Sequence, residues 1–346
     1  MKVDKEYCMS SYLTFRYVAR PDTVFKEGMP HVEHECVPDN EKQPCRTADD
    51  IDKQIRNVLS KYDLSHASVF LSGGMDSAIL ASYLPKGAKA YTARCVGAGR
   101  IDETERAAEY CRRNGLEHVI VDVSWEDYKN TMDKLMLHDG CPIIPNEPQA
   151  YMLALKAKED GSDLLVYGDC ADTEFGGMTK LLSRDWDFDG FVDRFTFLNP
   201  KKVLKKPADV SEVYEKYKVN GNGIDFVSFI GGPYAVSAAG ALTNAMDTVG
   251  IDHVDPYEHC CLAGPLDLAR VRRGDSKYLI RDLFRMKYPG LEVPEKLPMS
   301  RPADAWLADW EGPTRDEFIP GCVKSLTGEQ KLLLYSLERF LNLIGA

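Results

Sequence analysis

The chain has 346 residues, of which 44% are hydrophobic and 28% are charged, as in a globular protein with a sizeable core. Its 54 acidic and 43 basic residues give a net charge of −11, which disfavours nucleic acid as a partner. No apolar stretch looks long enough for a membrane span, and the first residues lack a signal-peptide core. We therefore expect a cytoplasmic protein that contacts no membrane.

The first 48 residues differ in character from the rest of the chain. An apolar, aromatic run at 12–18 precedes a polar, proline-containing stretch, which predicts strands, turns and a linker. Thr47 and Asp49 are candidate N-caps of a helix that opens at this point. We expect a short segment at 1–48, similar to the tail of a lost domain, and one larger domain at 49–346.

Strands and helices then alternate along the chain. Short apolar runs predict buried strands at 67–71, 89–95, 118–123 and 163–167. Helices are predicted at 78–84, 102–114 and 150–159, with Gly115 as a C-terminal glycine, and again at 328–343. This alternation predicts an α/β fold with a doubly wound parallel sheet and a mostly helical portion beyond about residue 180. Ligands of such folds bind at the carboxyl ends of the strands.

A loop rich in glycine and serine, Ser72-Gly73-Gly74-Met75-Asp76-Ser77, follows the first of these strands. The glycines let backbone N–H groups approach an anion, and the helix behind them favours phosphate. The two serine hydroxyls add donors, whereas Asp76 is itself an anion and fits a ligand of Mg²⁺. A simple tight turn needs none of these polar side chains. The loop lacks Gly-Lys-Ser/Thr and is therefore not a Walker A sequence.

This loop resembles the SGGxDS pyrophosphate loop of the N-type ATP pyrophosphatases, which include asparagine, GMP and NAD synthetases and tRNA thiolation enzymes. The resemblance implies a sheet of the adenine nucleotide alpha hydrolase-like (PP-loop) type. It also implies that ATP, with Mg²⁺, is cleaved to AMP and pyrophosphate. It does not identify the second substrate.

A second segment favours one branch of that superfamily. Residues 168–177 read Gly-Asp-Cys-Ala-Asp-Thr-Glu-Phe-Gly-Gly and look like the G-E-G-A-D-E-x-x-G-G segment of the asparagine synthetases. The resemblance implies that Asp172 is the second Mg²⁺ ligand beside Asp76. Residues 250–257 are similar to the family's G-x-E-x-R-x-P-F, and the likeness extends over roughly residues 50–320.

Two lysines match later motifs of the same family. Lys277 falls in residues 276–281, which resemble K-x-x-L-R, and is implied in nucleotide binding. Lys296 has the offsets to Pro302 and Trp306 that are found in K-x-G-F-x-x-P-x-x-x-W. The resemblance implies that Lys296 stabilises the charge that develops on the phosphates. The residues implied in the nucleotide pocket are Phe70, Ser72, Gly73, Gly74, Asp76, Ser77, Ala93, Tyr167, Gly168 and Lys277.

The sequence departs from the family at two acidic positions. Asp169 stands where G-E-G has glutamate, and Asp252 stands where G-x-E has glutamate. In the related β-lactam synthetases these positions carry a Tyr–Glu pair that deprotonates the attacking amine. Asp169 and Asp252 are therefore candidates for positioning or deprotonating a nucleophile. Val254 replaces the arginine of G-x-E-x-R-x-P, which argues against free aspartate as the acid substrate.

The resemblance predicts an ATP-dependent carbon–nitrogen ligase that converts a carboxylate into an acyl-adenylate and transfers it to ammonia or an amine. Glutamine-dependent members begin with a catalytic cysteine, whereas residue 2 here is Lys2 and Cys8 lies too far in. We therefore expect no glutaminase domain; a separate glutaminase subunit and a homodimer stay open as partners. Two alternatives also stay open: amination or thiolation of a carbonyl in another small molecule or nucleobase, and a non-catalytic nucleotide-binding scaffold.

Overall fold

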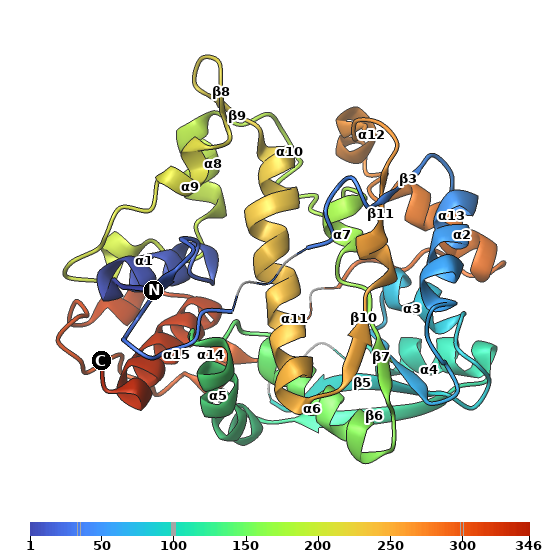
Figure 1. Cartoon of the computed structure of the whole chain (residues 1–346), viewed down its shortest axis with the longest axis horizontal. Coiled ribbons are helices and arrows are strands. Elements are labelled where there is room, and N and C mark those ends of the chain that lie inside the picture. Colours follow the sequence, from blue (N-terminus) through green and yellow to red (C-terminus); the bar gives the residue numbers. More distant parts are fainter. Residues whose placement is uncertain (33, 35, 98–101, 298, 300) are drawn as a thin grey trace.

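The computed structural model describes residues 1–32, 34, 36–97, 102–297, 299 and 301–346. Its central feature is a five-stranded parallel sheet in the order β10-β7-β4-β5-β6 (Figure 1). The chain runs outward from β4 through β5 to β6 and then returns to the other side of β4. The sheet is therefore doubly wound, with its switch point between β4 and β7, and the predicted fold class is confirmed. These strands are β4 (Ala67–Phe70), β5 (Lys89–Cys95), β6 (Glu117–Val123), β7 (Leu164–Val166) and β10 (Asp252–Val254).

The strand register determines which residues meet at the edge of the sheet. β4 and β7 pair with Val69 opposite Val166, and β7 and β10 pair with Val254 opposite Val166. Because these strands point the same way, the residues that follow them meet at one edge. Asp252 lies opposite Leu164, at the other end of β10.

Helices cover both faces of the sheet, and most of them were predicted with slightly different ends. Thr47 caps the first helix after residue 47 in a capping box with Asp50. α5 (Trp125–Asp139) was not predicted, although its buried residues recur at helical spacing. The first face is covered by α2 (Ala48–Leu59), α3 (Met75–Ala81), α4 (Thr104–Asn114) and α13 (Tyr278–Lys287), and the second by α5, α6 (Glu147–Glu159) and α11 (Ala235–Val249). α11 and α13 lie in the portion that was expected to be mostly helical, without predicted bounds.

The N-terminal segment contains a helix where strands and turns were expected. α1 (Lys5–Phe15) is buried from Tyr7 to Phe15 and packs against the C-terminal α15 (Gly328–Ile344). Because it is buried on all sides, it has no polar face, and its period is not visible in the sequence. Short strands do occur in this segment, at β2 (Thr23–Val24) and β3 (Gln43–Cys45). The two ends of the chain lie on the same side of the molecule (Figure 1).

The run that joins α10 (Phe226–Phe229), the π-helix η2 (Ile230–Tyr234) and α11 corrects one expectation from sequence. In the described part of the chain it is the one helix, Phe226–Val249, that is long and apolar enough to cross a membrane. Its mean hydropathy is 1.3, but 56% of the apolar window is buried inside the protein. It stands upright in the middle of the molecule and packs against α6, as a core helix does (Figure 1).

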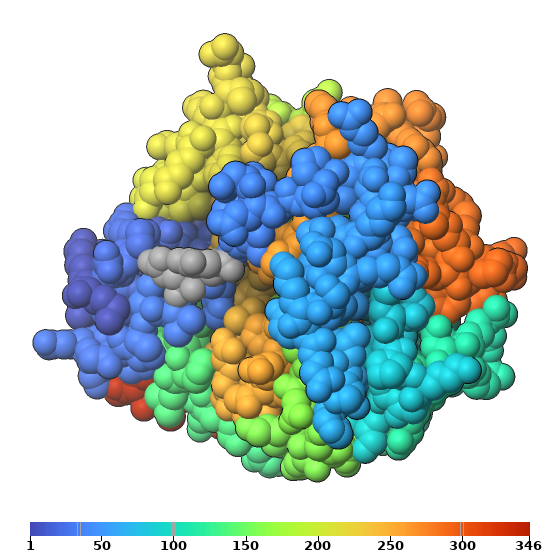
Figure 2. Space-filling view, turned by 45° about the vertical axis from the view of Figure 1, so that its right-hand side comes forward, coloured from blue at the N-terminus to red at the C-terminus, as the bar shows by residue number. Residues whose placement is uncertain are grey.

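The other elements are mostly short and connect these layers. The hairpin β8–β9 projects from the body of the molecule, at the tip of the yellow region in Figure 2. These connecting elements are β1 (Lys2–Val3), α7 (Ala171–Glu174), α8 (Phe188–Phe195), η1 (Pro200–Lys202), α9 (Glu212–Glu215), β8 (Lys218–Val219), β9 (Gly223–Ile224), η3 (Pro256–His259), β11 (Cys260–Leu262), α12 (Leu268–Arg272), α14 (Ala303–Trp306) and η4 (Cys322–Ser325).

Candidate active site

A cavity of about 420 Å³, here called the main cavity, opens where β4, β5 and β7 end. This volume is in the range of small-molecule sites. Among the described residues, Gly73 and Asp252 are the two predicted site residues that do not line it. The predicted residues that do line it are Phe70, Ser72, Gly74, Asp76, Ser77, Ala93, Tyr167, Gly168, Asp169, Asp172, Lys277 and Lys296. The structure thus brings together segments more than 200 residues apart.

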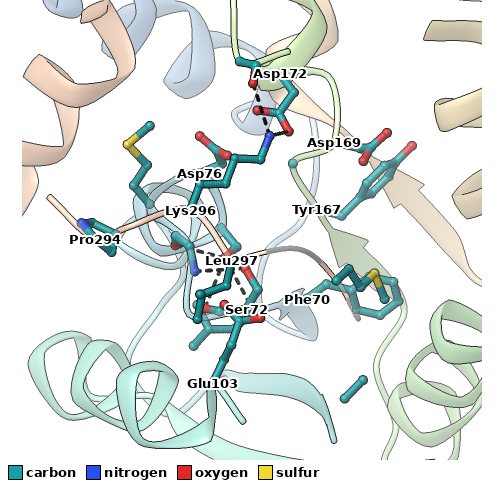
Figure 3. A pocket seen from close by; sticks show the side chains of 18 of the residues that line it. Phe70, Ser72, Asp76, Glu103, Tyr167, Asp169, Asp172, Pro294, Lys296 and Leu297 are labelled. Atoms are coloured by element: carbon teal, nitrogen blue, oxygen red, sulfur yellow. Dashed lines mark hydrogen bonds and ion pairs between the residues drawn. The ribbon is translucent and has the colours of Figure 1, made fainter. Parts of the chain in front are cut away.

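Hydrogen bonds between its two serines close the loop at 72–77, here called the phosphate loop after the ligand predicted for it. Ser77 Oγ accepts the backbone N–H of Ser72 at 3.0 Å, and the two hydroxyls lie 3.0 Å apart. Ser72 Oγ accepts the N–H of Gly74 at 3.1 Å. Ser72 is exposed and faces the main cavity (Figure 3). The serines therefore shape the loop as well as offering donors to a ligand.

Arg106 on α4 ties the phosphate loop to the segment that carries Lys296. Its Nη1 donates to the carbonyl of Gly73 at 3.2 Å and to that of Glu295 at 3.1 Å. A Cβ at Gly73 would lie 2.9 Å from the Cβ of Glu103, so the close approach of α4 requires glycine. Gly73 consequently acts through packing behind the cavity.

Trp306 anchors the far end of the Lys296 segment. Its indole N–H donates to the carbonyl of Val96 at 3.1 Å. Its ring stacks on Trp125 at a centroid distance of 5.7 Å and an angle of 25°. The spacing from Lys296 through Pro302 to Trp306 thus joins a cavity lysine to an aromatic anchor beyond the end of β5.

Two lysines and two carboxylates form an ion cluster in the main cavity. Lys277 Nζ is hydrogen-bonded to Asp76 and lies 2.8 Å from Asp172 Oδ1. Lys296 Nζ lies 2.6 Å from Asp172 Oδ2. Figure 3 shows Lys296 and Asp172 side by side in the cavity. Burial opposes ionisation of Asp172, but the two ammonium groups outweigh it and lower the pKa of the carboxyl. Burial would likewise lower the pKa of Lys277, but Asp76 and Asp172 raise it. Asp172 and Lys277 are therefore held in their charged forms, whereas burial raises the pKa of Asp76 and Lys277 works against that rise.

The backbone near this ion cluster lets Asp172 and Lys277 approach each other closely. Lys277 adopts the left-handed conformation with φ 52°, which is uncommon for a residue other than glycine. A Cβ at Gly177 would lie 2.0 Å from Asp172 Oδ1 and 2.5 Å from Lys277 Cδ. Glycine at 177 is therefore required for the buried ion pair.

The donor set at Asp76 fits a Mg²⁺ ligand. Asp76 Oδ1 is buried and has no hydrogen-bond partner among the described residues. Nowhere in the described part of the chain do three or more His, Cys, Asp or Glu side chains gather as a metal site. Mg²⁺ is typically held by one or two carboxylates together with substrate phosphates, which matches this arrangement. Asp76 and Asp172 are the residues that would hold it, and this remains a prediction.

The sequence-based pairing of Asp169 with Asp252 does not match the structure. Asp252 is exposed at the amino end of β10, whereas Asp169 lines the main cavity beside Tyr167 (Figure 3). The acid that β10 brings next to Asp169 is Asp255, which is 3% exposed and follows this strand. Asp255 Oδ2 accepts the N–H groups of Asp169 and Cys170, each at 2.8 Å. Asp255 therefore positions the loop on which Asp169 lies.

Replacement of Asp255 tests this positioning role. Asp255 also accepts the N–H of Tyr257 at 2.9 Å, so Asp255→Ala leaves three backbone donors without their acceptor. We expect the free energy of unfolding to fall by about 3 kcal/mol in urea titrations. The control Asp252→Ala is expected to change it by less than about 0.5 kcal/mol. Equal effects of the two substitutions would contradict the assignment.

A second cavity of about 410 Å³, here called the side cavity, adjoins the main cavity. The two share Gly177, Met178, Tyr234 and Lys296. No motif in the sequence indicated the side cavity. It is lined by Gly177, Met178, Thr179, Lys180, Leu181, Arg194, Phe195, Phe197, Tyr234 and Lys296.

Arg16, at the end of α1, supports the aromatic wall of the side cavity. It is in the left-handed conformation, and its guanidinium lies 3.9 Å from the ring centroid of Phe197. Its Nε is buried without a hydrogen-bond partner among the described residues. Burial raises the pKa of Tyr234 to about 12, and Arg16 works against that rise. The N-terminal segment thus contributes to the site region, which its sequence did not suggest.

Comparison with known proteins relates part of the chain to the asparagine synthases. Residues 64–218 match the protein-family model described as asparagine synthase. The chain is 28% identical over 202 residues, 51% of its length, to the glutamine-hydrolyzing asparagine synthetase 1 of Bacillus subtilis strain 168. The matched part covers 31% of that relative, so this chain spans about a third of its length. Part of the chain is therefore similar to the asparagine synthases, and about half of its length is distantly similar to that synthetase.

Proposed function

We propose that the protein adenylates a carboxylate and transfers the acyl group to ammonia or an amine. The similarity to the asparagine synthases implies an ATP-dependent amide-forming ligase, and the step and substrates are our inference. A carboxylate oxygen attacks the α-phosphorus of ATP, and the bond to pyrophosphate breaks. The nitrogen then attacks the acyl carbon, AMP leaves with the bonding electron pair, and a base takes the proton.

The observation that carries this proposal is the ion cluster beside the phosphate loop. Lys277 and Lys296 place two ammonium groups in the main cavity, where Asp76 and Asp172 hold them. Positive charges that are already placed in the cavity stabilise negative charge that builds up on phosphate oxygens. Mg²⁺, when bound, supplies further positive charge there. Lys296 has a side chain that is 56% exposed, so it can turn from Asp172 toward a ligand.

Asp169 is the proposed base for the attacking nitrogen. Burial, and next the neighbouring carboxylate of Asp172, raise the pKa of Asp169 to about 6, while Arg16, Lys296 and Lys277 work against that rise. A base with this pKa is largely ionised at pH 7 and accepts a proton readily.

The rate of amide formation should therefore depend on pH through Asp169. Only the ionised carboxylate accepts a proton, so kcat/KM for the amine should fall about tenfold between pH 7 and pH 5. Initial rates are to be measured at constant ionic strength, with the amine's own ionisation allowed for. The Asp169→Asn variant should be slower, and its kcat/KM should not fall between pH 7 and pH 5. The same fall in that variant would rule out Asp169 as the base.

Isotope transfer tests the reaction itself. The protein is incubated with Mg·ATP, ammonium and a panel of carboxylic acids labelled with ¹⁸O in the carboxyl group. Adenylation predicts equal amounts of AMP and pyrophosphate, with one ¹⁸O atom in the AMP, by mass spectrometry. ADP with labelled phosphate would indicate an acyl-phosphate instead. Absence of nucleotide cleavage with every acid would leave only a nucleotide-binding protein.

A further inference from the structure

We infer that the side cavity binds the carboxylic acid substrate, and that this acid has a flat apolar body, a second anionic group and no ammonium group. The inference rests on the proposed adenylation, because it assigns the acid that is activated. The shared residues Met178, Tyr234 and Lys296 join the two cavities. An acid in the side cavity therefore has its reacting end at Lys296 and its body away from the nucleotide.

The wall of the side cavity determines the shape of the acid. Phe195 packs edge-to-face on Phe197 and on Tyr234, with ring centroids 5.5 and 6.2 Å away and angles of 65° and 79°. Phe197 and Tyr234 are only partly buried, and both line the side cavity. A flat ring placed here extends an existing set of aromatic contacts. The rings of Phe195 and Phe197 offer no hydrogen bonds to a small polar acid such as aspartate.

The charges of the side cavity determine the ionic groups of the acid. Among the described residues that line it there are three cations, Lys180, Arg194 and Lys296, and no carboxylate. The chain as a whole has more acidic than basic residues, 54 against 43, so a lining without acids is unexpected from composition. An α-ammonium group would find no carboxylate in this cavity. Substrates with an anionic group are favoured, and amino acids are disfavoured.

Two of these cations are available to a ligand. Lys296 is paired with Asp172, but the side chains of Lys180 and Arg194 have no ion pair or hydrogen bond with any residue that the structure describes. Both are exposed, which places them at the solvent side of the cavity. Lys180 precedes α8 and Arg194 lies in the last turn of that helix, and neither of them lines the main cavity. A second anionic group at the far end of the acid would meet them.

Calorimetry with matched acids tests this assignment without turnover. Binding is measured in Mg²⁺ and α,β-methylene-ATP, which cannot be cleaved between the α- and β-phosphates. The probes are terephthalate, 4-methylbenzoate, succinate and aspartate. Terephthalate is expected to bind about tenfold more tightly than 4-methylbenzoate, and aspartate most weakly. The inference would be overturned if succinate or aspartate bound as tightly as terephthalate or more tightly. It would also be overturned if none of the four probes bound.

Charge reversal locates the second anionic group. The double variant Lys180→Glu, Arg194→Glu should weaken terephthalate binding at least about tenfold and leave 4-methylbenzoate binding nearly unchanged. The matched control Lys201→Glu, Lys202→Glu alters two exposed lysines that do not line the side cavity and should leave both affinities unchanged. Unchanged terephthalate affinity in the first double variant would overturn the inference.

The binding and isotope experiments separate the two proposals. Tight terephthalate binding that depends on Lys180 and Arg194, without labelled AMP from any acid, supports the side cavity and overturns adenylation. Labelled AMP from aliphatic acids, at rates that do not change in the Lys180→Glu, Arg194→Glu variant, supports adenylation and overturns the assignment of the side cavity.

Discussion

The Lys277→Met variant should lose pyrophosphate release and about 3–5 kcal/mol of its free energy of unfolding. The side chain of Lys277 is 3% exposed and separates two carboxylates. Methionine has a similar length but no charge, so Asp76 and Asp172 would face each other without the ammonium group between them. Unfolding in urea, followed by circular dichroism, measures the loss of stability.

Magnesium provides a readout of this variant that does not depend on activity. Mg²⁺ at millimolar concentration should restore part of the stability of Lys277→Met and have a smaller effect on the wild type, because a cation that binds only the folded protein stabilises it. The control Lys287→Met removes a lysine of α13 that pairs with Asp52 outside the main cavity. It should retain pyrophosphate release. A Lys277→Met protein with normal stability and turnover would refute the role of the buried ion cluster.

The Lys296→Ala variant should lower kcat about 100- to 1000-fold while changing the affinity for ATP little. In the resting protein Lys296 is bound to Asp172, and a ligand must draw it away. Its contribution is therefore greatest when charge builds up on the α-phosphate. Steady-state rates of pyrophosphate release and equilibrium binding of ATP separate the two quantities.

Stability distinguishes this lysine from Lys277. Because the side chain of Lys296 is 56% exposed, its removal should leave the unfolding transition unchanged. Lys205→Ala, at an exposed lysine outside both cavities, is the control and should behave as the wild type. A change in KM alone would assign Lys296 to ground-state binding. Normal kinetics would mean that its spacing to Pro302 and Trp306 carries no catalytic meaning.

Features encoded within a short stretch of sequence were predictable. The strand at 89–95 was predicted with the observed bounds, because an apolar run between turn residues specifies a buried strand. The Ser72–Ser77 loop was predictable because its glycines, hydroxyls and acid are contiguous. Gly115 was recognised as a C-terminal glycine and has the left-handed conformation that this position requires.

Features that depend on strand register or distant packing were not predictable. Asp252 and Asp255 lie three positions apart, and only the pairing of β10 with β7 shows which of them reaches the edge of the sheet. The neighbourhood of Arg16 and Tyr234 joins the first helix to a helical run more than 200 residues later. No local sequence pattern predicts this contact, because neither Arg16 nor Tyr234 belongs to a motif within its own segment.

The contact of Arg106 with two distant carbonyls makes the phosphate loop and the Lys296 segment thermodynamically linked. One guanidinium nitrogen serves both Gly73 and Glu295, so a shift of either carbonyl changes the geometry of both bonds. By reciprocity, a pyrophosphate that orders the loop must favour the bound position of the lysine to the same degree. In the proposed reaction, departure of pyrophosphate would weaken the hold on Lys296, so the nitrogen would attack in a site whose cation is free to move.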